Sequence, residues 1–179
     1  MMGPWLIFAT LINKGCIALF DGMPQTRESG IFVEKAKVNL LGVVPSLVQS
    51  WKSSGCMDGL DWSAIKVFSS TGESSNGEAM LFLMALASYK TIIEYCGGTE
   101  VGGSYVSSTV IQPNCPSYFS AKSIGIDFRI LNADGQDCQT GEVYLAPPAL
   151  GLSTHLLNKD HNEVYFKDCP SGSDGEVLR

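Results

Sequence analysis

The stretch that decides the fold runs Val38-Asn39-Leu40-Leu41-Gly42-Val43-Val44-Pro45-Ser46. Its dense apolar part is typical of a strand that is covered on both faces. Pro45 follows at once, and proline with its fixed φ suits the first position of a helix. We therefore expect a strand over Val38–Val44 and a helix from Pro45 through Trp51.

The same alternation continues along the chain. A short apolar strand is expected over Ile65–Phe68, a strongly apolar helix over about Gly77–Ser88, and a third strand over Thr91–Tyr95. Strands that alternate with helices predict a parallel sheet with helices on its faces, the α/β class. Upstream, Ile31–Val38 is expected to be a helix with its apolar residues turned inward.

Two polar loops follow the second and third strands. They are Ser69–Ser74 (Ser-Ser-Thr-Gly-Glu-Ser) and Cys96–Glu100 (Cys-Gly-Gly-Thr-Glu). Because the carboxyl ends of parallel strands meet at one edge, and open α/β sheets bind ligands there, both loops are candidates for a binding site.

The N-terminal segment is apolar up to Ile12. Pro4 can begin a helix, and we expect Trp5–Ile12 to form a buried one. The apolar run is too short to span a bilayer and lacks the basic start of a signal peptide. Cys16–Phe20 is expected to be a short buried strand, followed by a turn at Asp21-Gly22.

After Gly103 the sequence becomes a series of short β-rich pieces. They are expected over Tyr105–Ile111, Ile124–Leu131 and Glu142–Leu145, with a hairpin-type turn at Asn132–Gly135. We therefore divide the chain into an α/β part, residues 1–103, and a mostly β, barrel-like part, residues 104–179.

Composition narrows the class of protein. The 179 residues are 45% hydrophobic and 17% charged, a balance typical of a globular domain with a core. The net charge of −6 opposes a non-specific nucleic-acid surface. Six cysteines without close spacing predict free, mostly buried thiols in an intracellular protein, and no zinc site.

The segment Tyr95–Gly103 (Tyr-Cys-Gly-Gly-Thr-Glu-Val-Gly-Gly) carries the strongest chemical signal. Its four glycines let backbone approach a ligand closely, and a hydroxyl beside a carboxylate suits a phosphate with Mg²⁺. A plain glycine-rich turn is the alternative, and from these residues alone it is slightly favoured. The segment supplies neither a dinucleotide fingerprint nor a Walker loop.

The loop Thr71–Ser74 has two compatible interpretations. It can cradle a nucleotide, and it can begin the next helix, with Ser74 or Ser75 as N-cap and Glu78 as the capping-box partner. Elsewhere, no Cys, Asp or Glu with the spacing of metal ligands surrounds His155 or His161, and both histidines are expected at the surface. Gly102–Val106 fails the serine-hydrolase elbow at its last position.

Four segments in this order resemble the acyl-adenylate-forming (AMP-binding) ligases, and in particular the plant peroxisomal acyl-activating enzymes of the acetyl-CoA-synthetase type. They are Met1–Trp5, Ser70–Glu73, Glu94–Glu100 and Gly141–Val143. The resemblance implies a fragment of the large N-terminal domain of such a ligase. It also implies ATP and Mg²⁺ as cofactors, a small carboxylic acid as substrate and CoA as the probable acyl acceptor.

The resemblance also implies residue roles. Thr99 would touch the α-phosphate and Glu100 would hold Mg²⁺, which makes these two the candidate catalytic residues. The nucleotide would be bound by Gly72, Glu73, Ser74, Tyr95, Cys96, Gly97, Gly98 and Thr99, and the acyl group by Met1, Met2, Thr71 and Gly97.

The chain departs from the family pattern at two positions. Cys96 stands where the family commonly places an aromatic ring against adenine, and Tyr95 next to it points the other way in a strand. Gly97 stands where acetyl-CoA synthetases have tryptophan. A glycine there would leave room for an acyl group larger than acetate.

The family's phosphate loop, its later Gly-Asp pair and its C-terminal domain with a catalytic lysine are not found in this sequence. We therefore expect no adenylation by this chain alone. The alternative is a non-catalytic α/β module that keeps the fold and binds nucleotide or a protein partner. The resemblance suggests the peroxisome or the cytoplasm, although the chain ends without a peroxisomal Ser-Lys-Leu signal.

Overall fold

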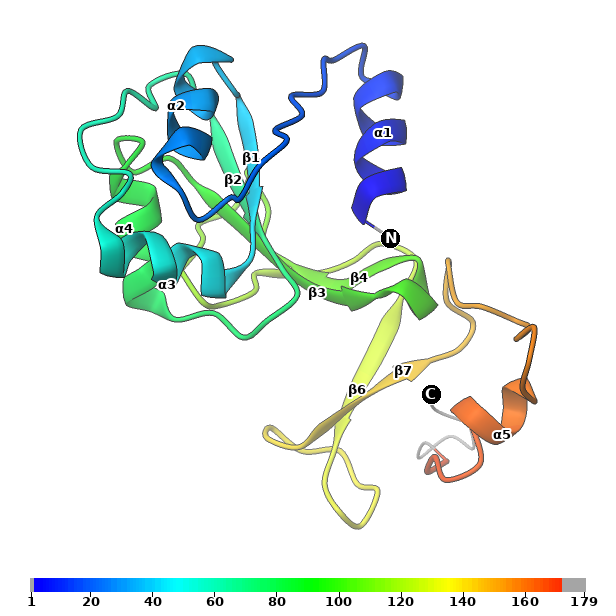
Figure 1. Cartoon of the computed structure of the whole chain (residues 1–179). Coiled ribbons are helices and arrows are strands. Elements are labelled where there is room, and N and C mark those ends of the chain that lie inside the picture. The colour runs from blue at the N-terminus through cyan, green and yellow to red at the C-terminus, as the bar shows by residue number, and fades with distance from the viewer. Residues whose placement is uncertain (1, 172–179) are drawn as a thin grey trace. The chain divides into compact units, whose positions relative to one another are not determined.

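The computed structural model describes residues 2–171 (Figure 1). Its helices and strands are α1 (Met2–Ile12), α2 (Arg27–Lys35), β1 (Leu40–Val43), α3 (Pro45–Ser54), β2 (Val67–Ser70), α4 (Gly77–Ala85), β3 (Ile92–Gly98), the 3-10 helix η1 (Thr99–Val101), β4 (Gly103–Ser107), β5 (Ala121–Lys122), β6 (Asp127–Leu131), β7 (Glu142–Ala146) and α5 (His161–Tyr165). The five strands of the larger sheet follow the order β1-β2-β3-β4-β5.

The chain divides into two compact units. The first comprises Met1–Cys96 and Ser107–Ala121, and the second comprises Gly97–Val106 and Lys122–Arg179.

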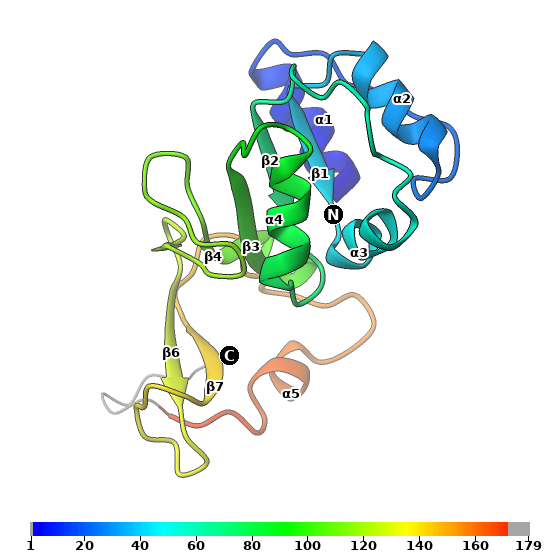
Figure 2. The same ribbon diagram turned by 90° about the vertical axis from the view of Figure 1, so that its left-hand side faces the viewer.

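The first unit is built on the parallel strands β1, β2 and β3. Val43 lies opposite Ser70, and Ser70 lies opposite Glu94, so the three strands end at the same edge. Helices α3 and α4 lie on one side of these strands and α1 on the other (Figures 1 and 2). The parallel sheet expected from the alternating pattern is confirmed, and the short strand β1 is followed directly by α3.

The core of the first unit lies between the strands and the helices α2 to α4. Within it the ring of Trp62 packs against two other aromatic rings, with centroids 5.7 Å from Trp51 and 6.4 Å from Phe68. Deep burial of large apolar side chains such as these is the main stabilising term of a domain this size. The largest fully buried side chains of this cluster are Val48, Met57, Ile65, Phe68, Met80 and Leu83.

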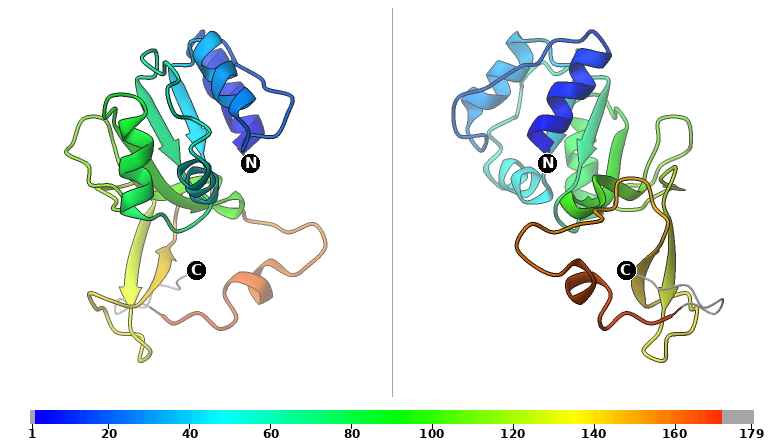
Figure 3. Two further views of the ribbon diagram at one scale, coloured as in Figure 1. Left: turned by 60° about the vertical axis from the view of Figure 1, so that its left-hand side comes forward. Right: turned by 90° about the vertical axis from the view of Figure 1, so that its right-hand side faces the viewer.

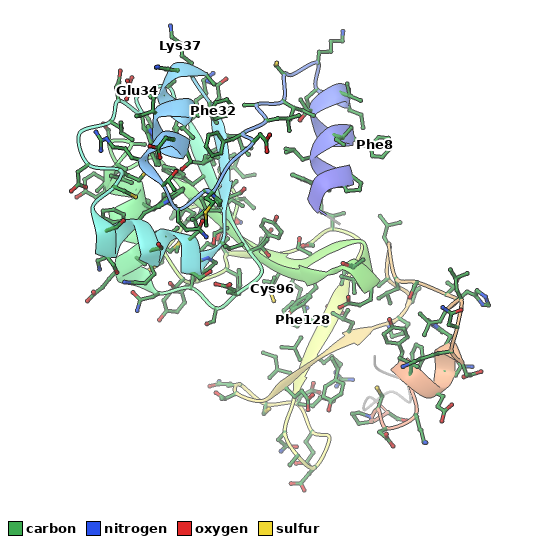
Figure 4. All side chains as sticks on the ribbon, viewed as in Figure 1. Phe8, Phe32, Glu34, Lys37, Cys96 and Phe128 are labelled. Atoms are coloured by element: carbon green, nitrogen blue, oxygen red, sulfur yellow. The ribbon has the colours of Figure 1, made fainter. Side chains whose placement is uncertain are left out.

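The N-terminal helix forms, but the prediction that it is buried is wrong. Phe8 is 64% exposed and Ile12 is 78% exposed. Phe8 points away from the helices and strands of the first unit (Figure 4), and Figure 3 shows α1 from two further sides. The helix is apolar on all sides, a pattern normally found in buried helices, yet no element in the described part of the chain encloses it.

Two further expectations for the N-terminal half are wrong. Cys16–Phe20 is irregular and mostly exposed, because it pairs with no described strand, and Phe20 instead packs on Phe32 with ring centroids 5.4 Å apart. β1 is not covered on both faces, since Leu40 is 47% exposed whereas Val43 is buried. The apolar run marked a strand correctly but overstated its burial.

The cysteines are free, as expected, but the prediction that they are mostly buried is wrong. Cys16 and Cys115 are exposed and the other four are half-buried. Five of the six lie outside the helices and strands, where side chains are seldom fully enclosed.

Helix α4 begins one residue later than the capping-box interpretation requires. The N-cap is Asn76, whose side-chain oxygen accepts hydrogen bonds from the backbone of Glu78 at 2.9 Å and Ala79 at 3.2 Å. Ser75 instead donates to the hydroxyl of Ser117 at 3.0 Å. The prediction of Ser74 or Ser75 as N-cap is therefore wrong, because asparagine at the next position satisfies the same orphan donors.

We expect Asn76→Ala to lower the free energy of unfolding by about 1 kcal/mol, because it leaves two backbone donors of the first turn without their partner. Ser74→Ala, two positions earlier, is the control and should leave stability within about 0.5 kcal/mol. Urea titrations followed by circular dichroism measure both. Equal stabilities of the two variants would show that water replaces the cap at no cost.

The second unit is built on the antiparallel pair β6 and β7, in which Asp127 lies opposite Ala146 and Leu131 opposite Glu142. The predicted turn at Asn132–Gly135 is confirmed: the side chain of Asn132 accepts hydrogen bonds from the backbone of Asp134 and Gln136, at 3.0 and 2.9 Å. Within the described residues, no helix is long and apolar enough to cross a membrane.

Candidate nucleotide-binding site

The loop Thr71–Ser74 directly follows β2. Within the first unit, hydrogen bonds attach it to strand β3 and to the start of helix α3. The hydroxyl of Thr71 donates to the backbone oxygen of Tyr95 on β3 at 2.8 Å. This bond places the loop beside the end of β3, as expected for neighbouring parallel strands.

The middle of this loop needs a glycine. Gly72 has a φ of +92°, a backbone conformation that residues with a side chain rarely adopt. Ser74 is exposed, and the structure records no partner for its hydroxyl in the described part of the chain. The loop therefore presents backbone and a hydroxyl to solvent, an arrangement suited to a polar ligand.

The side chain of Glu73 points back to helix α3. Its carboxylate accepts two hydrogen bonds from Ser46, one from the backbone nitrogen and one from the hydroxyl, each at 2.9 Å. A role for Glu73 in binding the nucleotide was predicted by resemblance; in the structure both oxygens of its carboxylate already accept hydrogen bonds from Ser46.

The end of β3 carries Tyr95 and Cys96 on opposite faces. Ile92 and Glu94 are buried toward the core, so Cys96 shares their side of the strand and Tyr95 shares the side of Ile93. Burial raises the pKa of the Tyr95 phenol above its usual value, which keeps the phenol neutral. Figure 4 marks Cys96 on this strand.

Glu94 is a polar residue of this region that the sequence reasoning did not single out. Its side chain is only 4% exposed, and its carboxylate accepts a hydrogen bond from the backbone nitrogen of Ser117. Its own backbone oxygen accepts a hydrogen bond from Ser108 at 2.7 Å. A lone carboxylate within the apolar run that starts at Ile92 was the available signal.

In the second unit, neighbouring atoms occupy the space that a side chain would take at Gly97 and at Gly98. A side chain on Gly97 would collide with the carbonyl oxygen of Gly103 and lie 2.5 Å from the Cα of Ser104. β4 backbone therefore occupies the place of a side chain at position 97. The acyl-pocket role of Gly97 stays a prediction, but the backbone supplies an independent reason for glycine here.

Gly98 makes room for the carboxylate of Glu100. A side chain on Gly98 would lie 2.5 Å from the carboxyl carbon of Glu100, so the acid folds back over the glycine. Glu100 is exposed, and no described residue bonds or pairs with its carboxylate. Its backbone oxygen accepts from Ser153 at 3.1 Å, which anchors the residue while leaving its acid free.

Glu100 also borders a hollow of about 250 Å³ within the second unit. Thr99, at the start of η1, is exposed beside it. The residues that line the hollow are Glu100, Val101, Tyr105, Val143, Leu145 and Tyr165.

The residues present suit Mg²⁺ only if one carboxylate binds it and water and phosphate oxygens supply the other ligands. No group of three or more acids, histidines or cysteines that could enclose a metal occurs among residues 2–171. Mg²⁺ often binds through one or two carboxylates, with water and substrate phosphates completing its shell. Glu100, whose carboxylate has no partner among the described residues, fits that arrangement.

The remaining predicted site residues lie at the N-terminus. Met1 lies outside the described residues. Met2 begins α1, but its side chain is also outside them. Their acyl-pocket role stays a prediction. His155 is exposed as expected, whereas His161 is half-buried between Tyr165 and Phe166, with ring centroids 5.2 and 5.7 Å away.

Solved structures share this fold. An anthranilate CoA ligase in complex with anthranoyl-AMP superposes on 92% of this chain and 31% of its own, with a TM-score of 0.69 at 16% identity. A long-chain-fatty-acid-CoA ligase from Archaeoglobus fulgidus superposes on 86% of this chain and 33% of its own, with a TM-score of 0.65 at 18% identity. The fold is that of part of the N-terminal domain of an adenylate-forming ligase.

Sequence comparison agrees. The whole chain is 47% identical to hexanoyl-CoA synthase of Cannabis sativa and 44% identical to the probable peroxisomal acyl-activating enzyme 17 of Arabidopsis thaliana. The chain spans about a quarter of the length of these relatives. No protein-family model matches it. Over its whole length the chain is therefore a homologue of one segment of the plant acyl-activating enzymes, and it shares the fold of adenylate-forming ligases.

Proposed function

We propose that this chain is the nucleotide-binding part of an ATP-dependent ligase that activates a small carboxylic acid as acyl-AMP and passes the acyl group to a thiol, most simply CoA. The observation that carries the proposal is the unpaired carboxylate of Glu100, folded over Gly98 and next to the exposed Thr99. A metal-phosphate complex needs an acid of this kind with no competing cation.

In the proposed reaction, a carboxylate oxygen of the substrate attacks the α-phosphorus of ATP. The bond from that phosphorus to the bridging β-oxygen breaks, and pyrophosphate leaves. The thiol sulfur then attacks the acyl carbonyl, the thiol proton is lost and AMP leaves. Bound Mg²⁺ would offset phosphate charge in the first step.

The residues act mainly by position and charge, as in other phosphorus chemistry. The Thr99 hydroxyl would donate to the α-phosphate, and Glu100 would hold the metal. The backbone of Gly72 to Ser74, with Tyr95, Cys96, Gly97 and Gly98, would line the nucleotide. Thr71, Gly97, Met1 and Met2 would face the acyl group.

One relative is named for a hexanoyl product and two are described as peroxisomal. A substrate larger than acetate and a peroxisomal site of action are therefore part of the proposal.

A chimera tests the reaction. The stretch of the Cannabis sativa enzyme that aligns with this chain is replaced by it, and hexanoate-dependent ATP–pyrophosphate exchange is measured. We expect exchange well above the background without hexanoate, because the transplanted loops supply phosphate and metal contacts.

A folded chimera that binds ATP but catalyses no exchange would contradict the proposal and favour the non-catalytic module. The parent enzyme, assayed in parallel, confirms that the conditions support exchange. Circular dichroism of the chimera establishes that it is folded.

A further inference from the structure

Glu73 caps a helix that it does not belong to. Helix α3 begins after Val44, whose apolar side chain makes no capping hydrogen bond, and Pro45 has no backbone donor. The first unpaired backbone donor of α3 is therefore that of Ser46, and Glu73 accepts it at 2.9 Å. A carboxylate is also the preferred charge at a helix N-terminus.

The second oxygen of Glu73 makes the attachment bidentate. It accepts from the hydroxyl of Ser46 at 2.9 Å, so both carboxylate oxygens are bound to one residue, 27 positions earlier in the chain. A bidentate attachment restricts the rotation of the carboxylate and holds the loop backbone next to it.

The opposite end of the loop is held as well. The hydroxyl of Thr71 donates to the backbone oxygen of Tyr95 on β3 at 2.8 Å. Between the two attachments, a Cβ added to Gly72 would lie 3.7 Å from the side chain of Val44. The four-residue loop is thus fastened to the segment after β1 and to β3. Fastening at both ends lowers the conformational entropy that the loop would lose on binding a ligand.

We propose that Glu73 is a positioning residue, whose carboxylate acts through Ser46 to hold the Thr71–Ser74 backbone ready for the nucleotide. The inference rests on the proposed function for the ligand, but not for the attachment itself. It differs from a direct role, in which the carboxylate of Glu73 would touch adenine or ribose and Ser46 would be irrelevant.

The test compares Ser46→Ala, Glu73→Ala and the double variant in the 179-residue chain. ATP with Mg²⁺ is titrated by calorimetry, and backbone hydrogen exchange is followed in the protein without nucleotide. Glu78→Gln is the matched control, because its side chain is 85% exposed and only pairs with Lys52 at the surface.

We expect Glu73→Ala to weaken ATP binding about 10-fold and Ser46→Ala about 3-fold, because the alanine at 46 keeps its backbone donor. The double variant should resemble Glu73→Ala, because the two residues act as one unit. Exchange of the backbone amide at position 46, whose hydrogen Glu73 accepts, should accelerate strongly in Glu73→Ala and less in Ser46→Ala, and exchange should stay unchanged at Met80 and Leu83 in α4.

The inference would be overturned if Ser46→Ala matched the wild type both in ATP affinity and in exchange of the amide at position 46, even if Glu73→Ala binds ATP weakly. If the wild-type chain binds no ATP, the proposed function fails for this chain, and hydrogen exchange alone then decides. Faster exchange of the amide at position 46 in both variants supports the attachment, and unchanged exchange of that amide refutes it.

Discussion

Gly97→Ala should lower the free energy of unfolding by about 3 kcal/mol, the upper part of the range for overpacking. The added methyl group would collide with the carbonyl oxygen of Gly103 and lie 2.5 Å from the Cα of Ser104. Both obstacles are backbone atoms. A flexible side chain could rotate away, whereas here strand β4 itself must move.

Gly103→Ala is the matched control for this prediction. Gly103 belongs to the same two-strand segment, and an added Cβ there meets no atom within 4 Å. It should cost no more than about 1 kcal/mol, the ordinary difference between glycine and alanine in a strand. Urea titration of both variants measures the difference, and equal midpoints would mean that β4 yields easily.

This result bears on the acyl-pocket interpretation of Gly97. By resemblance, glycine replaces a tryptophan and leaves space for a longer acyl group. In the structure that space holds the backbone of β4. A strong loss of stability with alanine would assign the glycine to chain packing, and acyl length would then be set by other residues.

Glu100→Gln should reduce carboxylate-dependent ATP–pyrophosphate exchange of the chimera about 100- to 1,000-fold, the usual loss when a group that stabilises transition-state charge is removed. The amide has the shape of the acid but no charge with which to hold Mg²⁺. Because Glu100 is exposed and bonds to no described residue through its carboxylate, the change should leave the fold intact.

The loss at Glu100 should appear mainly in the rate at saturating ATP and be partly relieved at high Mg²⁺ concentration. Glu78→Gln makes the same chemical change on α4 and should retain full exchange. Near-normal exchange by Glu100→Gln would place the metal elsewhere and remove the main support for the proposed function. Circular dichroism of both variants excludes misfolding as the cause.

Much of the first unit was predictable because its signals are local. The apolar run before Pro45 and the apolar stretches around Phe68 and Ile92 each mark a strand, and all three strands occur where they were expected, within a few residues. The turn at Asn132–Gly135 was predictable for the same reason, since an asparagine side chain bonds to backbone close by in the chain.

Burial was less predictable than secondary structure. The segment Trp5–Ile12 is apolar enough for a core helix and does form a helix, but no described element packs over it. An apolar pattern shows that a segment can be buried. Whether something covers it depends on elements far away in the chain.

The sequence by itself determined the alternation of strands and helices, the two candidate loops at one sheet edge and, through its motifs, the ligase family. Only the tertiary structure decided which distant residues these side chains and glycines contact. It joined Glu73 to Ser46, buried Glu94 against Ser117 and set Gly97 against the backbone of Gly103. Each of these pairs is separated by several to many residues, and folding alone brings such partners within bonding distance, so no local pattern contains them.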